Sequence, residues 1–181
     1  MPTQTDPRPA FRATHEWVGG LIDNVAPAQL GNPTPCPDWT VRDLLGHVVS
    51  GAARVAAVGR GGDPFSAPAL LTGVPDGEWP ERYRAAVGQL WEVWDNDSVL
   101  TAIVTVPPGI QAPGFAAVLQ FSTETLVHGW DLAVATGQDP EAPAAIAAPA
   151  LAMAREFVPA TPRGGPIPFG PPVPVPADSL P

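Results

Sequence analysis

The chain has 181 residues, of which 45% are apolar and 15% charged, as expected for one globular domain with a substantial core. Its net charge of -9, with arginine as the only strong base and no basic cluster, argues against nucleic acid or an anionic membrane as partner. The chain has no signal-peptide pattern and no apolar run near the roughly 18 residues of a membrane span, and the single Cys36 excludes an internal disulfide, so we expect a cytoplasmic protein.

The first third of the chain predicts two helices separated by a proline-rich loop. Apolar residues recur at helical spacing between about residues 9 and 26. The following segment, 31–38, contains several prolines and a glycine and cannot be helical. Thr40 and Asp43 then have the capping-box spacing that starts a helix, which we expect to continue to about Val58.

A long segment rich in glycine and proline, 59–78, precedes a third predicted helix over about 80–95. The β-branched residues of 98–106 predict a short extended segment. A fourth helix is predicted over 113–136, with Gly137 as the residue that ends it.

The remainder predicts one supporting helix and a tail. The alanine-rich residues of about 143–157 suit a fifth, short helix, whereas the proline-rich residues 159–181 cannot form a packed core. Together these elements predict an all-α fold: an up-and-down four-helix bundle with a short extra helix, a short extended segment and an irregular C-terminal tail. We expect one helical domain, 1–158, followed by the tail.

The predicted helix 113–136 is apolar on nearly every side, yet it carries a small group of ionisable side chains. From residue 107 to residue 138 the only ones are Glu124, His128 and Asp131, and a helix places them on one stripe roughly 60° wide. A helix this apolar is usually buried, and buried charge is costly unless it is paired or binds a metal. The stripe therefore indicates a site.

Glu124 and His128 are four residues apart, so their side chains point the same way and could chelate one ion. The alternative is an ordinary Glu–His hydrogen bond on the helix surface. His47, at the border of the apolar face of the second helix, would supply a third ligand, although such border histidines are often only amphipathic fillers. One glutamate and two histidines form a known Zn²⁺ site that leaves a position open for water or substrate. Ni²⁺, Fe²⁺ or Mn²⁺ would suit the same donors.

Several other residues have two interpretations each. Asp131 could accept the ring N–H of a ligand histidine, or bond to a helix end or an arginine instead. Cys36 has no basic neighbour in the sequence to lower its pKa, which favours a small loop-filling residue over a nucleophile. His15 is interpreted as a surface or border residue. Trp39 and Trp130 flank the proposed site helices and could line a pocket.

Two runs of the sequence resemble signatures of a known family. The first is TPCPDWTVRDLLGH, residues 34–47, which resembles the opening of the second helix in DinB/YfiT-like metal-binding bundles. The second is ETLVHGWDLAVATG, residues 124–137, which is similar to a signature of the branch related to the mycothiol-dependent maleylpyruvate isomerase N-terminal domain. The likeness spans about residues 10–157, and residues 169–175 have counterparts as well.

The resemblance implies that His47, Glu124 and His128 bind a divalent metal near one end of a helical metal-binding bundle, with Zn²⁺ as the expected ion. It also implies a low-molecular-weight thiol, mycothiol or bacillithiol, as cosubstrate. The metal would hold this thiol as a thiolate that attacks an electrophilic carbon. Since the chain has no lysine, an anionic thiol would be held by arginine, and the candidates are Arg42, Arg54, and Arg82 or Arg84.

We therefore expect a metal-dependent enzyme, monomeric or homodimeric, that uses a mycothiol-type thiol for transfer to, or isomerisation of, a small electrophilic substrate. In this hypothesis Asp131 orients a ligand, and Trp39 and Trp130 help to bind the cosubstrate. Two alternatives stay open. One is a non-catalytic module that binds a metal or a small molecule, and the other is a thiol-independent hydrolase, isomerase or cyclase on the same bundle.

Overall fold

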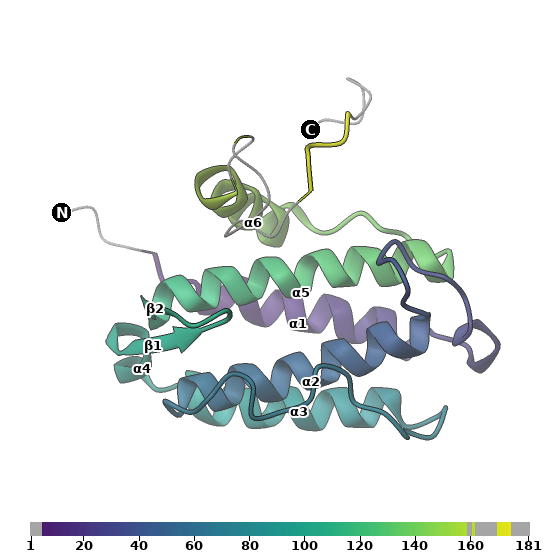
Figure 1. The fold of residues 1–181 in the computed structure, drawn as a ribbon, viewed down its shortest axis with the longest axis horizontal. Helices are drawn as coiled ribbons and strands as arrows, with labels where there is room; N and C mark the ends of the chain where they lie inside the picture. Colours follow the sequence, from purple (N-terminus) through teal and green to yellow (C-terminus); the bar gives the residue numbers. More distant parts are fainter. Residues whose placement is uncertain (1–4, 159–160, 162–169, 175–181) are drawn as a thin grey trace.

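The structure is a computed structural model that describes residues 5–158, 161 and 170–174, so most of the predicted tail lies outside the described residues. Within the described part the chain is mostly helical, with one antiparallel pair of strands (Figure 1). The elements in chain order are α1 (Arg8–Asp23), a 3-10 turn η1 (Pro27–Gln29), α2 (Val41–Gly59), α3 (Trp79–Trp94), α4 (Asp97–Thr101), β1 (Ile103–Val106), β2 (Ile110–Pro113), α5 (Gly114–Thr136) and α6 (Ala144–Phe157).

The five predicted helices are confirmed, and the signals at their ends act as expected. The Thr40 hydroxyl accepts a hydrogen bond from the Asp43 backbone N–H, and the Asp43 carboxylate accepts one from the Thr40 N–H at 2.9 Å. This reciprocal pair satisfies two backbone donors at the start of α2. At the other end of the domain, Gly137 ends α5 with φ of 68°, a left-handed conformation that glycine adopts without steric cost.

The extended segment predicted over 98–106 is only partly correct. Its first residues form the short helix α4 instead, because the Asn96 side chain accepts a hydrogen bond from the Ser98 backbone N–H at 3.0 Å and caps the turn. The last four residues form β1, which pairs with β2 from Ile103 opposite Pro113 to Val106 opposite Ile110. The hairpin leads directly into α5.

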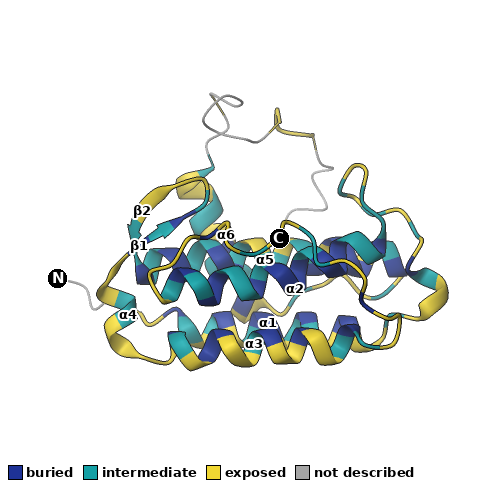
Figure 2. Cartoon of the chain, turned by 60° about the horizontal axis from the view of Figure 1, so that its bottom comes forward, coloured by how far each residue is buried: buried dark blue, intermediate teal, exposed yellow. Residues whose placement is uncertain are grey.

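Four long helices, α1, α2, α3 and α5, contact one another in a closed ring. Helix α1 packs against α5 and α3, while α2 packs against α3 and α5. Figure 1 shows α1 beside α5 and α2 beside α3, and in Figure 2 the buried residues lie on the sides of these helices that face each other. Helix α6 packs on α5 and α1 from outside this ring.

The up-and-down order predicted for these helices is wrong at one connection. Helices α2 and α3 run in the same direction, since Arg42 at the start of α2 pairs with Asp76 just before α3, and the Trp94 indole N–H at the end of α3 donates to the Val55 carbonyl at 2.8 Å. The segment 60–78 makes this possible, because it is long enough to return the chain to the end at which α2 began. Long crossover connections of this kind are known in four-helix folds.

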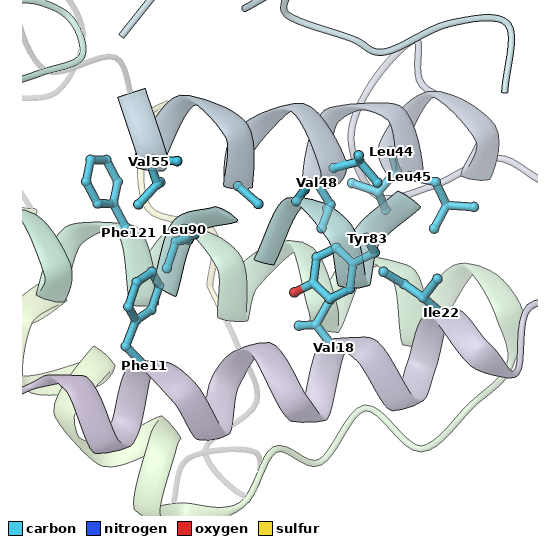
Figure 3. Close-up of a cluster of buried hydrophobic side chains, with 14 of the residues drawn as sticks. Phe11, Val18, Ile22, Leu44, Leu45, Val48, Val55, Tyr83, Leu90 and Phe121 are labelled. Atoms are coloured by element: carbon cyan, nitrogen blue, oxygen red, sulfur yellow. The ribbon is translucent and has the colours of Figure 1, made fainter. Parts of the chain in front are cut away.

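All four long helices contribute side chains to one core. In Figure 3, Phe11 and Val18 of α1, Leu44 of α2, Leu90 of α3 and Phe121 of α5 point into the same interior. Each is almost completely removed from solvent. Burying a side chain of this size stabilises the fold by roughly 1.5–3 kcal/mol.

His15, predicted at the surface or border of the first helix, is buried and only 5% exposed. Its Nδ1 lies 2.7 Å from the Tyr83 hydroxyl, and its ring packs on Phe11 at a centroid distance of 4.6 Å. Burial lowers the pKa of His15 to about 3, so the ring stays neutral. The spacing to Phe11 and Val18 was the signal for burial, because positions four and three residues away share one helix face.

Helices α1 and α5 approach closely at Gly129. A Cβ at this position would lie 2.5 Å from Trp17 Cζ3 and 2.7 Å from Val18 Cγ2. We expect Gly129→Ala to lower the free energy of unfolding by about 1–3 kcal/mol, the usual cost of overpacking, as measured by urea denaturation.

A matched control is Gly88→Ala on the exposed side of α3, where an added Cβ would meet nothing within 4 Å. This variant should be more stable than the wild type by roughly 0.5–1 kcal/mol, because alanine loses less backbone entropy than glycine in a helix. Equal stability of the two variants would contradict the close approach of α1 and α5.

Candidate metal centre

The structure brings the three predicted metal ligands together where α2 and α5 pack side by side. His47 projects from α2, and Glu124 and His128 project from successive turns of α5. One donor atom from each residue lies within 4.8 Å of the other two. His47 Nε2 is 3.6 Å from Glu124 Oε1, and the two imidazole rings are nearly perpendicular, with centroids 4.8 Å apart.

These separations fit a shared ion. Two donors on a tetrahedral Zn²⁺ with bonds of about 2.0–2.1 Å lie roughly 3.3 Å from each other. The His47–Glu124 distance of 3.6 Å is close to this value and is too long for a good hydrogen bond. The Glu124 side chain is 51% exposed, so rotation of its flexible carboxylate could close the remaining gap.

Both histidines present Nε2 with a free lone pair. His47 Nδ1 lies 3.2 Å from the backbone carbonyl of Ala69, which can only accept, so the ring proton is on Nδ1. His128 Nδ1 lies 3.1 Å from Asp131 Oδ2, which fixes its proton in the same way. Hydrogen bonding of the second ring nitrogen to a carbonyl or carboxylate is typical of metal-binding histidines.

The crossover segment 60–78 supplies the carbonyl that orients His47. It runs antiparallel along α2: Arg54 donates to Ala67 O, the Ser50 hydroxyl donates to Pro68 O, and Ala69 O follows beside His47. Two residues further along the segment, the Leu71 N–H donates to Gly46 O at 3.0 Å.

This close contact requires glycine at position 46, because a Cβ there would collide with Leu71 O. The backbone of the crossover is therefore held against α2 at the residue immediately before His47.

The surroundings also favour the ionised form of Glu124. When its ring is protonated, His47 holds the pKa of Glu124 below its usual range through a hydrogen bond and its charge, and the charges of His128 and Arg54 add smaller contributions. Glu124 is thus a carboxylate at neutral pH and can act as an anionic ligand.

Cys36 lies beside the site, which the sequence did not indicate. Its Sγ donates to Asp131 Oδ2 at 3.2 Å and is 3.9 Å from His128 Nδ1, so a basic group does lie near it in space. Burial, together with the Asp131 carboxylate, nevertheless raises the pKa of Cys36 to about 11. The thiol is therefore protonated, and the sequence-based preference for a non-nucleophilic residue agrees with this environment. Cys36 and the α5 residues are about 90 positions apart, which hid their proximity.

Of the two tryptophans predicted at the site, only Trp39 lies there. Its ring centroid is 4.7 Å from that of His47 and 6.1 Å from that of His128. Neither tryptophan is among the described residues that line the cavity, and Trp130 is 46% exposed. It follows His128 by two residues, so it projects from nearly the opposite side of α5. Helix α5 is thus less buried than its composition predicted.

Of the predicted arginines, Arg54 is the one that reaches the site. It lines the same cavity as the three candidate ligands. Arg42 pairs instead with Asp76 at 2.7 Å and is not among the described cavity residues. Arg82 and Arg84 pair with acidic groups on the surface, Glu78 and Asp23.

The cavity is lined by a few polar groups and a larger set of apolar ones. His47, Glu124 and His128 line it together with Arg54, Thr125 and an apolar group that consists of Val48, Val55, Val58, Pro64, Pro107 and Phe121. A few polar groups among apolar walls are typical of a site for a small molecule.

Fold and site together define a helical protein with a His–Glu–His cluster that lines a small cavity. The family described as mycothiol maleylpyruvate isomerase N-terminal domain matches residues 11–133. The chain belongs to this family. Two uncharacterized proteins of Mycobacterium tuberculosis, from strains CDC 1551 / Oshkosh and ATCC 25618 / H37Rv, are each 35% identical to it over 177 residues, or 97% of this chain and 92% of theirs.

Solved structures share the fold. The crystal structure of the mycothiol-dependent maleylpyruvate isomerase superposes with a TM-score of 0.63 at 15% identity, and that of a mutant of this enzyme with 0.66 at 14%. In both cases the match covers 77% of this chain and spans 64% of the length of the solved chain.

The environment of Cys36 leads to a testable difference in reactivity. With a pKa of about 11, the thiol should react with iodoacetamide at pH 7.5 far more slowly than an ordinary cysteine. We expect a rate lower by a factor on the order of 100, since only the thiolate reacts and free cysteine has a pKa of about 8.5. Mass spectrometry of the alkylated protein measures the rate.

The control is the same reaction in guanidinium chloride, where unfolding should restore the ordinary rate. Asp131→Asn should accelerate alkylation of the folded protein, because it removes the neighbouring negative charge. Equal rates for the folded and unfolded wild type would show that Cys36 does not occupy this environment.

Proposed function

We propose that the protein is a metal-dependent enzyme that uses a low-molecular-weight thiol of the mycothiol type for transfer to, or isomerisation of, a small electrophilic substrate. The observation that carries the proposal is the matched orientation of the two histidines. His47 and His128 each place their Nδ1 proton on a fixed acceptor and leave Nε2 free beside the Glu124 carboxylate. A surface Glu–His pair would not need both acceptors.

Under this proposal His47, Glu124 and His128 hold a divalent ion, with Zn²⁺ as the expected one. When bound, the ion supplies positive charge that stabilises a thiolate at neutral pH. Glu124 balances part of this charge. The apolar walls formed by residues such as Val55 and Phe121 hold the substrate and limit the access of water.

Arg54 would bind an anionic group of the thiol or the substrate. It lines the cavity and is half-buried, and its Nε and Nη2 donate to Ala67 O. This hydrogen bonding holds the guanidinium in place before a ligand arrives, and a planar guanidinium suits carboxylates and phosphates.

The attacking thiol would come from a small molecule and not from the protein. Cys36 is the only cysteine, and its pKa of about 11 keeps it protonated at neutral pH. Family membership and the fold shared with a mycothiol-dependent isomerase support mycothiol as the thiol. Because the chain spans 64% of that enzyme, we leave the electrophile open and do not assign maleylpyruvate. The proposal includes the prediction that residues 1–158 form a four-helix metal-binding bundle, followed by the tail 159–181.

Metal binding is the first test. We expect the purified wild type to bind about one equivalent of Zn²⁺ or Co²⁺, and His128→Ala and Glu124→Gln to bind at least about 100-fold more weakly. Removing a residue that hydrogen-bonds to a metal ligand weakens metal binding by up to about 100-fold, and removing a ligand itself should weaken it more. Elemental analysis and competition with a chromogenic chelator measure occupancy and affinity.

The matched control is Glu92→Gln, the same chemical change at an exposed glutamate of α3. It should bind metal as the wild type does. Unchanged metal content in His128→Ala would refute the proposed centre.

Turnover separates the proposal from its alternatives. Metal-loaded protein should consume mycothiol in the presence of an epoxide, a quinone or an unsaturated acid, or should isomerise the last, and Glu124→Gln should be at least about 100-fold slower because the ion is lost. Loss of free thiol and product formation are followed by chromatography.

Metal bound without any turnover would identify a binding module. Turnover that persists when thiol is omitted would identify a hydrolase, isomerase or cyclase that works without it.

A further inference from the structure

Asp131 is the most deeply buried charged residue at the site, and it accepts hydrogen bonds from two donors. Its side chain is 8% exposed. The same oxygen, Oδ2, accepts from His128 Nδ1 at 3.1 Å and from Cys36 Sγ at 3.2 Å. A buried carboxylate is stable only where donors satisfy it. The thiol and the imidazole N–H together perform this role.

The thiol is held in place by a loop that bonds mainly to itself. The Cys36 N–H donates to Thr34 Oγ1 at 3.1 Å, and the Thr34 hydroxyl lies 3.1 Å from Cys36 O and 3.0 Å from Trp39 O. The Trp39 N–H returns to Cys36 O, and Asp38 between them has φ of 66°. These hydrogen bonds hold the loop 34–39 in a conformation that places the Cys36 thiol on Asp131 and the Trp39 ring beside His47.

We propose that Cys36 and Asp131 are positioning residues that act as a unit: the thiol fixes the Asp131 carboxylate, and the carboxylate fixes His128 with its proton on Nδ1 and its Nε2 free for the ion. The inference rests on the proposed metal centre. It adds a role for a cysteine whose own chemistry is suppressed, and it couples the loop 34–39 to the ligand on α5.

The physical reason is the number of donors that a single oxygen needs. A carboxylate oxygen has two lone pairs, and here the thiol occupies one and the imidazole N–H the other. Without the thiol, Asp131 would keep one of these two described partners and could rotate toward water or another donor. His128 would then lose the acceptor that selects its tautomer, and Nε2 would carry a proton more often.

The tautomer of His128 can be observed without any metal. Long-range ¹H–¹⁵N correlation spectra of the metal-free protein distinguish a protonated Nδ1 from a protonated Nε2. We expect wild-type His128 to carry its proton on Nδ1. Cys36→Ala and Asp131→Asn should shift the ring toward the Nε2–H form, whereas Cys36→Ser, which keeps a hydroxyl donor, should retain most of the wild-type signal.

Metal affinity gives the second readout. Co²⁺ binding should weaken by roughly 10- to 100-fold in Asp131→Asn, the range found for partners of metal-binding histidines, and by about 10-fold in Cys36→Ala. Cys36→Ser should recover most of this loss. The visible spectrum of bound Co²⁺ should change in the two weakened variants, because the geometry of the His128 ligand changes.

The matched control is Ser122→Ala. It removes another buried hydrogen bond of α5, the 3.2 Å contact with Thr14, at a position that does not touch the site. It should change neither the tautomer nor the Co²⁺ affinity, and thermal melts monitored by circular dichroism identify any variant that fails to fold.

An unchanged tautomer in Cys36→Ala and Asp131→Asn would overturn the inference, as would equal loss of affinity in Cys36→Ser and Cys36→Ala. Failure of the wild type to bind metal would instead overturn the proposed function, and the tautomer measurement would still decide the hydrogen-bond network.

Discussion

The site depends on the contact between α2 and α5, where His47 Nε2 lies 3.6 Å from Glu124 Oε1. Neither helix alone could hold a small ion with enough ligands, and the relative position of the two helices fixes the distance between their donors. Two irregular segments stabilise this arrangement. The crossover 60–78 provides Ala69 O for His47, and the loop 34–39 brings Cys36 to Asp131. The hydrogen bonds of these segments, as much as the helices, orient the imidazoles.

Much of the helical structure could be predicted from local patterns. The Thr40–Asp43 capping box and Gly137 marked helix ends because their effects act within a single turn. The stripe of Glu124 and His128 could be found for the same reason, since helical spacing alone aligns residues four positions apart.

Features that depend on distant contacts could not be predicted in this way. Cys36 lies in a loop, where helical spacing gives no information about its neighbours. Only the fold shows that its thiol donates a hydrogen bond to Asp131. The direction of α3 depends on the path of the segment 60–78. The sequence shows the length of this segment but not its path. Two other errors could have been avoided from helical spacing. Its spacing to Phe11 and Val18 put His15 on the buried face of α1, although its partner Tyr83 could not be seen in the sequence. Trp130 is two residues from His128 and therefore lies on nearly the opposite side of α5.

The path of the crossover has a consequence for how relatives of this protein could diverge. His47 is oriented by a main-chain oxygen, at Ala69, and two neighbouring anchors of this segment, Ala67 O and Pro68 O, are main-chain oxygens as well. One side chain of the same segment, Pro64, lines the cavity. Replacing it would reshape the cavity while the orienting carbonyls remain, so that one scaffold could accept molecules of different size without altering its polar groups.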